Sequence, residues 1–68
     1  SNTSSQAQTI KYADIIDNSV DIKNSEDEFA RIFLFECRAL LKAMTKGDDR
    51  LYKKAVETVQ QCIEEQGK

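Results

Sequence analysis

The feature that most constrains this chain is an imbalance between two predicted amphipathic helices. At about 100° per residue, the apolar side chains of residues 26–46 spread over roughly 220° of the helix, whereas those of residues 49–66 occupy roughly 140°. One narrow stripe cannot cover so broad a face, so the first of these helices needs a further partner. That partner is its own N-terminal segment, a second copy of the chain or another protein.

Local sequence signals mark the ends of both helices. Ser25 and Glu28 have the spacing of a capping box at the start of the first helix. Gly47 is the residue type that most easily takes the left-handed conformation that ends many helices. Asp48 or Asp49 then caps the second helix. So short a connection predicts that the two helices are antiparallel neighbours.

The segment before this hairpin is predicted in two parts. Residues 1–9 are expected to form a disordered tail without large apolar side chains, and the first two are typical of residues left by tag removal. Residues 10–23 fit either a helix over 10–17 followed by an extended 20–22, or two extended pieces joined by a turn. In both cases the large apolar side chains of this segment are expected to cover the broad face: Ile10, Tyr12, Ile15, Ile16, Val20 and Ile22.

The size of the chain favours assembly. Its 68 residues make one small helical domain, predicted over residues 10–67. A core of this size rarely stabilises a fold by more than roughly 3–5 kcal/mol without a cross-link, a metal or a partner. We therefore expect an all-α antiparallel hairpin, over about 26–46 and 49–66, that pairs with a second copy as a dimeric four-helix bundle.

Composition argues against several classes of function. The chain has no histidine, so Ser-His-Asp and Cys-His triads are excluded within it. Two cysteines with carboxylates make a poor zinc site, and Gly47 and Gly67 cannot form a phosphate-binding glycine-rich loop. The net charge of −2 provides no general attraction for nucleic acid or anionic lipid. We expect no enzyme activity, no cofactor and no metal.

The apolar runs and the cysteines predict a cellular location. No run approaches the roughly 20 residues of a membrane-spanning helix, and the polar N-terminal residues do not resemble a signal peptide. Cys37 and Cys62 fit free intracellular thiols that act as small apolar residues. Their predicted offset of about 6 Å along the hairpin, added to an interaxial distance of about 8–10 Å, is too large for a disulfide. We expect a cytoplasmic protein with reduced cysteines.

The broad face of the first helix is the predicted binding surface. Its candidate interface residues are Phe29, Ile32, Phe33, Phe35, Glu36, Cys37, Leu40, Leu41 and Met44. Phe35 projects into the basic stripe that contains Arg31 and Arg38. There it is an isolated surface residue, a residue covered by the N-terminal segment, or a partner anchor. Glu36 projects into the apolar face, where it reaches water at the edge or pairs with a basic side chain of a partner.

Charged residues are divided between the two ends of the hairpin. The turn is basic and the open end is acidic, and the helix dipole explains this for the first helix but not for the second. The basic residues at the turn are Lys42, Lys46, Arg50, Lys53 and Lys54. The pattern fits solvated surface charges, a second hairpin packed with its turn against the open end of the first, or a basic turn that binds an acidic ligand.

These observations favour a non-catalytic module for protein–protein interaction or dimerisation, with a scaffolding or regulatory role. One alternative is a docking fragment of a larger protein that binds a different chain. Another is a small DNA-binding regulator or antitoxin-like protein, because an extended 20–22 before two helices resembles the ribbon-helix-helix regulators. Those proteins read DNA with a strand rich in basic or polar side chains, whereas this segment offers Asp21 and Lys23. Nucleic acid is therefore the less favoured partner.

Overall fold

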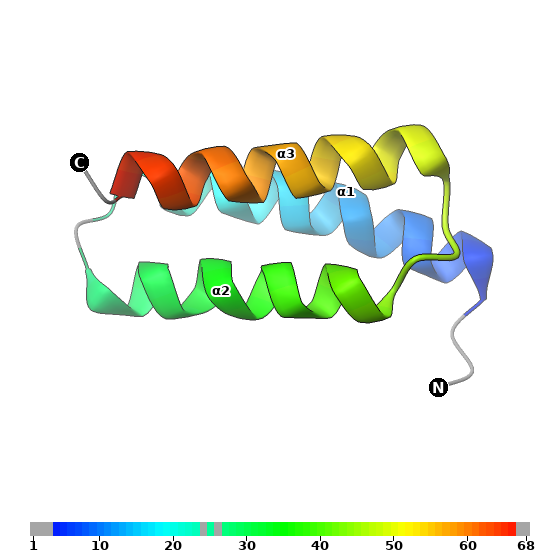
Figure 1. The fold of residues 1–68 in the computed structure, drawn as a ribbon, viewed down its shortest axis with the longest axis horizontal. Coiled ribbons are helices and arrows are strands. Elements are labelled where there is room, and N and C mark those ends of the chain that lie inside the picture. The colour runs from blue at the N-terminus through cyan, green and yellow to red at the C-terminus, as the bar shows by residue number, and fades with distance from the viewer. Residues whose placement is uncertain (1–3, 24, 26, 67–68) are drawn as a thin grey trace.

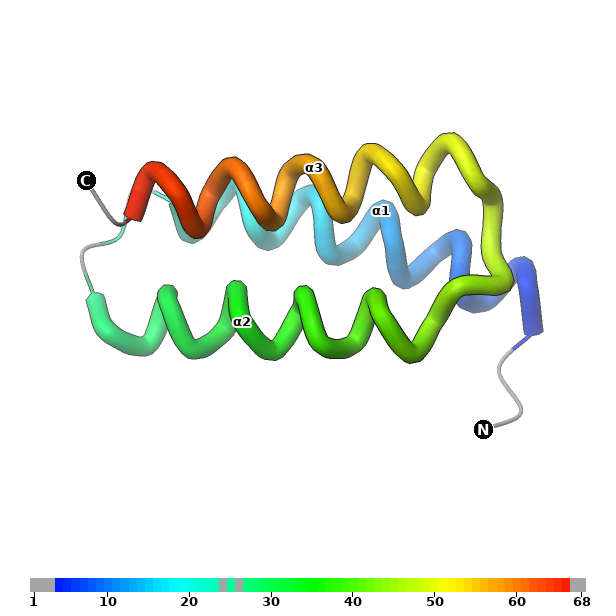
Figure 2. The backbone as a smooth tube through the Cα atoms, viewed as in Figure 1, coloured from blue at the N-terminus to red at the C-terminus, as the bar shows by residue number. Residues whose placement is uncertain are grey.

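The fold is a bundle of three helices. The computed structural model describes residues 4–23, 25 and 27–66. Within these residues the chain forms α1 (Ser5–Ile22), α2 (Glu28–Ala43) and α3 (Asp49–Gln66), and no strand. α1 and α3 run in one direction and α2 runs in the other (Figure 1). The two connections lie at opposite ends of the bundle (Figure 2). The predicted all-α fold is confirmed, with a long first helix in place of a short segment.

α1 is the main departure from the sequence prediction. Its cap is Ser4, whose hydroxyl accepts a hydrogen bond from the backbone N–H of Ala7 at 3.1 Å. Residues 5–9 are therefore helical rather than part of a disordered tail, and residues 20–22 are helical rather than extended. The remainder of the predicted tail, residues 1–3, lies outside the described residues. A helical 20–22 also removes the strand on which the resemblance to ribbon-helix-helix regulators depended.

The composition of its buried face explains why α1 was not recognised as one helix. The buried residues of α1 are Gln8, Tyr12, Ile15 and Ser19, which follow a helical spacing, and two of them, Gln8 and Ser19, are polar. Conversely, Ile10 and Val20, which were expected to be covered, are 65% and 49% exposed. Because hydrophobic periodicity is the main sequence signal for a helix, a buried face with these polar positions gives only a weak signal.

The boundaries of α2 also differ from the prediction, whereas those of α3 do not. Asp27, not Ser25, caps α2, because its carboxylate accepts a hydrogen bond from the N–H of Phe29 at 3.2 Å. α2 ends at Ala43, before the predicted boundary. Asp48 caps α3 as expected, because its carboxylate accepts a hydrogen bond from the backbone N–H of Leu51 at 2.9 Å.

Gly47 is required by a close approach rather than by a left-handed backbone. Among the described residues none has a positive φ, so the predicted helix-ending role of this glycine is wrong. A Cβ atom on Gly47 would lie 2.5 Å from Cε2 of Tyr12 and 2.9 Å from the backbone nitrogen of Thr9. The connection between α2 and α3 therefore passes so close to α1 that a side chain does not fit.

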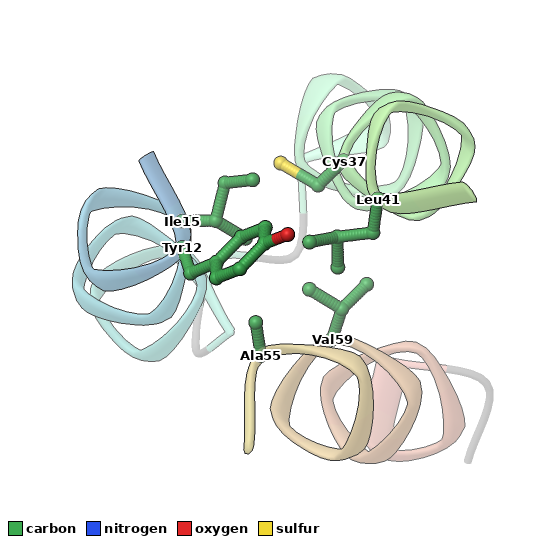
Figure 3. Packing of buried hydrophobic residues seen from close by; sticks show 6 residues of the cluster. All are labelled: Tyr12, Ile15, Cys37, Leu41, Ala55 and Val59. Atoms are coloured by element: carbon green, nitrogen blue, oxygen red, sulfur yellow. The ribbon is translucent and has the colours of Figure 1, made fainter. Parts of the chain in front are cut away.

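The core lies where the three helices meet (Figure 3). Its buried cluster is Tyr12, Ile15, Cys37, Leu41, Ala55 and Val59. Tyr12 is fully buried within it, and its ring packs edge-on against that of Tyr52 with the centroids 5.3 Å apart. Burial of a large apolar side chain contributes about 1.5–3 kcal/mol. α1 is thus an integral part of the fold and covers part of the broad face of α2.

The Tyr12 hydroxyl also fixes the connection between α2 and α3. It donates a hydrogen bond to the carbonyl of Met44 at 2.6 Å and accepts one from the N–H of Gly47 at 3.0 Å. Two neighbours on α1 act in the same way. The side chain of Gln8 accepts a hydrogen bond from the N–H of Lys46 at 2.9 Å. The hydroxyl of Thr9 accepts one from the N–H of Asp48 at 2.8 Å. Side chains of α1 therefore satisfy loop N–H groups that would otherwise need water.

A similar arrangement holds the other end of the bundle. The amide nitrogen of Gln66, at the end of α3, donates hydrogen bonds to the carbonyls of Lys23 at 2.9 Å and Ser25 at 2.6 Å. These carbonyls belong to the connection between α1 and α2. Each inter-helix connection is thus bonded to the helix that does not form it, which fixes the three helices relative to one another.

Candidate protein-binding groove

α1 is not placed symmetrically between its neighbours. It packs along α3 over much of its length and approaches α2 over a shorter stretch. Two hollows, of about 170 and 440 Å³, lie on the surface between α1 and α2. Asn18 and Phe33 line both of them, so the hollows adjoin each other, and we name the two together the α1/α2 groove.

The floor of the α1/α2 groove is apolar. Side chains from both helices form it: Ile15, Ile22, Phe29, Phe33, Cys37 and Leu40. Of these, Phe29 is 66% and Leu40 38% exposed, and Ile32, three residues from Phe29 on α2, is 51% exposed. A cluster of exposed large apolar side chains beside a depression is typical of an interaction site, whereas isolated ones are common on any surface.

The rim of the groove is acidic. Asp14 and Asp21 line it on α1, and Glu36 lines it on α2. Lys11 is the one basic side chain among the described lining residues. Its amino group lies 3.4 Å from the Asp14 carboxylate, and the two side chains are 46% and 55% exposed, so this ion pair is weak. The lining therefore has an excess of negative charge.

Phe35 lies apart from the groove. The guanidinium carbon of Arg38 is 5.1 Å from the centroid of its ring, and Arg38 reaches across to Gln60 of α3 at 3.4 Å. The ring is 41% exposed. The cation–π contact accounts for an aromatic residue on this basic side of α2.

The structure divides the predicted interface residues into three groups by their exposure. Leu41 and Cys37 are only 1% and 6% exposed, so they belong to the core of the bundle, although Cys37 also lines the groove. Phe33 and Met44 are partly buried against that core. The others are exposed on α2: Phe29, Ile32, Phe35, Glu36 and Leu40. Glu36 is exposed at the edge of the apolar face, which agrees with the first of its two predicted interpretations, contact with water.

Sequence reasoning missed the α1 side of the groove. Asp14, Asn18 and Asp21 are spaced by four and three residues, which places them on one face of a helix. The pattern was present in the sequence, but the prediction ended the helix before Asp21. These three residues could be placed on one face only if the segment was known to be one continuous helix.

Burial raises the pKa of both cysteine thiols. For Cys37 the loss of solvent is the largest cause, with Lys11 acting in the opposite direction and Glu36 adding to the increase. For Cys62 burial is again the largest cause, and its S–H donates to the carbonyl of Ser19 at 3.5 Å. Both cysteines are free, as predicted. Protonated thiols are poor nucleophiles and poor metal ligands, so they serve here as small apolar side chains.

The described part of the chain contains neither a candidate metal-binding cluster nor a candidate membrane-spanning helix. No group of three or more histidine, cysteine, aspartate or glutamate side chains lies close enough there to hold a metal ion. None of the helices described is both long enough and apolar enough to span a bilayer.

Comparisons with known protein families, with curated protein sequences and with solved structures found no match for this chain. Its functional interpretation therefore depends on the groove itself, which offers an apolar floor, an open shape and an acidic rim. These are features that proteins use to bind a segment of another polypeptide.

Proposed function

We propose that this chain is a non-catalytic helical module for protein–protein interaction, with a scaffolding or regulatory role, and that its α1/α2 groove receives one helix of a partner. The single observation that carries this function is the open apolar floor shared by α1 and α2. A helix placed there packs against both helices and completes a four-helix arrangement. Docking of an amphipathic helix into an apolar groove is a recurring mode of peptide recognition.

The exposed side chains indicate the strength of such binding. Phe29, Ile32 and Leu40 are 66%, 51% and 38% exposed in the free protein. Full burial of a large apolar side chain contributes about 1.5–3 kcal/mol, but part of this contribution is offset by the entropy lost on association. These values support a reversible interaction of a folded module rather than an obligate assembly.

A second copy of the chain is the other candidate partner, in the form of the dimeric four-helix bundle predicted from the sequence. That prediction assumed a hairpin whose broad face was largely uncovered. In the three-helix bundle, α1 supplies Tyr12 and Ile15 to the core and covers part of α2. The fold therefore has less need of a second copy, which supports a different chain as the partner.

The proposed function can be tested by selecting helical peptides from a displayed random library on the immobilised protein. The test variant is Leu40→Glu, which places a charge on the groove floor. The matched control is Val56→Glu on α3, because Leu40 and Val56 are 38% and 37% exposed and Val56 does not line the groove. Selected peptides should bind the wild type and the control, and should lose most of their affinity for Leu40→Glu.

Sedimentation equilibrium from micromolar to millimolar concentration completes this test. Self-association that Leu40→Glu removes and Val56→Glu leaves intact would support the interaction module with a second copy as its partner. A chain that stays monomeric and yields no peptide sensitive to Leu40→Glu would contradict the proposed function.

A further inference from the structure

We infer that the helix received by the α1/α2 groove is a basic amphipathic helix of another polypeptide, with an apolar ridge flanked on both sides by lysine or arginine. This inference rests on the proposed function, because it names the class of partner that the same groove binds. It depends on the placement of charge around the groove and on the surfaces that the other helices of the chain present.

The first observation is that acidic side chains stand on both rims. Asp14 and Asp21 lie on the α1 rim, about 10 Å apart along the helix axis at 1.5 Å per residue. Glu36 lies on the α2 rim and lines the same hollow as Asp14. A helix lying along the apolar floor therefore has carboxylates on either side, and basic residues at both edges of its apolar ridge would meet them.

The second observation concerns the positive charge available within the groove. Lys11 lies at one end and is already 3.4 Å from Asp14 on its own helix. It does not reach Asp21 or Glu36, for which the described residues provide no ion pair. Three carboxylates against one ammonium group leave the lining with a net negative charge. A partner with basic flanks would neutralise this excess, whereas an acidic partner would increase the repulsion.

The same charges disfavour a second copy as the occupant. A symmetric dimer pairs a surface with itself, so pairing through the groove would place acidic rims against acidic rims. A head-to-tail contact through α1 or α3 would need that helix to present a basic apolar ridge. On α3 the one exposed large apolar side chain among the described residues is Val56. On α1 they are Ile10 and Val20, which share the outer surface with Asp17.

Charge in this arrangement selects the partner more than it supplies affinity. Exposed ion pairs are individually weak and screened by salt. Several of them along one helix discriminate between a basic and an acidic partner that share the same apolar ridge, and they also speed association. The inference therefore predicts that the groove prefers a basic helix over an acidic one, and that this preference depends on ionic strength.

Two synthetic helical peptides test it directly on the full chain. They share one apolar ridge, but one is flanked by lysine and arginine and the other by glutamate. Titration calorimetry at low salt should show the basic peptide binding roughly tenfold or more tightly than the acidic one, since several weak ion pairs act together. The difference should shrink as salt is added.

Charge-reversed variants sharpen the test. The double variant Asp21→Lys and Glu36→Lys should reverse the preference, so that the acidic peptide binds more tightly. The control is Glu57→Lys with Glu64→Lys, which makes the same change in net charge on α3 and should preserve the preference for the basic peptide. Circular dichroism confirms that each variant is folded, and the wild-type comparison of the two peptides stands even where a variant does not fold.

The possible results separate this inference from the proposed function. Equal binding of both peptides, lost in Leu40→Glu, would overturn the inference about charge and leave the interaction module intact. Failure of both peptides, together with dimerisation that Leu40→Glu abolishes, would identify a second copy as the occupant and also overturn the inference. Failure of both peptides with a monomeric chain would overturn the inference alone if library peptides still bind in a manner sensitive to Leu40→Glu. It would overturn the inference and the proposed function together if the library yields no such peptide.

Discussion

The two sides of α1 are built in different ways. Toward α3 and the connection between α2 and α3, α1 packs closely and its side chains bond the loop backbone, with the Tyr12 hydroxyl 2.6 Å from the carbonyl of Met44. Toward α2 it leaves an open groove in which Phe29 is 66% and Leu40 38% exposed. One side of α1 thus stabilises the fold, whereas on its other side the apolar surface of α2 that faces the groove remains partly uncovered.

This difference separates residues that stabilise the fold from residues available for binding. The closed side combines buried apolar surface with satisfied polar groups, so substitutions there should lower the free energy of unfolding. The open side contributes less to stability, because its apolar side chains remain partly in water. Substitutions there should affect binding more than folding.

The largest effect on the closed side is expected for Tyr12→Ala. It removes a fully buried aromatic ring and both hydrogen bonds of the hydroxyl to the loop. Large-to-small substitution of a buried aromatic residue costs about 3–5 kcal/mol, which approaches the whole stability of a domain of this size. Urea unfolding should show a chain that is mostly unfolded without denaturant. Tyr12→Phe, which keeps the ring, should retain the fold with reduced stability. If Tyr12→Ala unfolded at the same urea concentration as the wild type, the claim that this side of α1 stabilises the fold would be contradicted.

Two adjacent leucines compare the sides most sharply. Leu41 is 1% exposed in the core and Leu40 is 38% exposed on the groove floor. Leu41→Ala should cost about 2–5 kcal/mol, while Leu40→Ala should cost less than half as much. Chemical denaturation of both variants measures the difference. Equal losses would show that the groove floor is as important to the fold as the core.

Gly47→Ala tests the close approach between the loop and α1. The added methyl group would meet the Tyr12 ring at 2.5 Å and the backbone of Thr9 at 2.9 Å. Because a backbone atom cannot move aside as easily as a side chain, we expect a loss of about 1–3 kcal/mol. The control is Lys46→Ala, an exposed neighbour expected to change stability by less than about 0.5 kcal/mol. If the two variants had the same melting temperature, the connection between α2 and α3 would have to lie further from α1 than the structure shows.

Ser19→Ala should stabilise the closed side. The side chain is fully buried, and its hydroxyl oxygen has no hydrogen-bond partner among the described residues. Replacing a buried unsatisfied hydroxyl by a methyl group removes a desolvation cost of about 1 kcal/mol. Thermal unfolding should show a modest increase in melting temperature, whereas a decrease would mean that the hydroxyl has a stabilising partner.

The smallest effect concerns pH. Burial raises the pKa of Cys37 and Cys62 above the ordinary value of 9.0, so the folded state favours the protonated thiols. This contribution is fully present below the unfolded-state pKa and is lost as pH rises through the folded-state pKa. The free energy of unfolding should therefore fall slightly above about pH 9. Double replacement by alanine should flatten this decline, and an unchanged slope would assign it to other groups.

The sequence predicted the elements whose signals are local. Asp48 caps α3, and the apolar stripe of that helix defined its bounds over 49–66. The presence of a helix after residue 26 followed from its continuous apolar pattern. Its cap did not, because Ser25 and Asp27 are both good capping residues, and only the backbone geometry distinguishes them.

Features that depend on distant contacts were not predictable from pattern alone. Gln8 is buried because it bonds the N–H of Lys46, which is far away in the sequence. The sequence around Gly47 does not reveal its role, which arises only because α1 lies against it. The difference in exposure between Leu40 and Leu41 also depends on contacts that are distant in the sequence. The predicted face contained both, but the position of α1 decided which one is buried.

The measurement that tests the central claim most directly is a titration of isotope-labelled protein with the basic amphipathic peptide, followed by NMR. Binding in the α1/α2 groove should shift the amide signals of Asn18, Phe33 and Leu40, which line it, and leave that of Val56 on α3 unchanged. Shifts centred on α3, or no shifts at peptide concentrations up to millimolar, would contradict the assignment of this groove as the binding site.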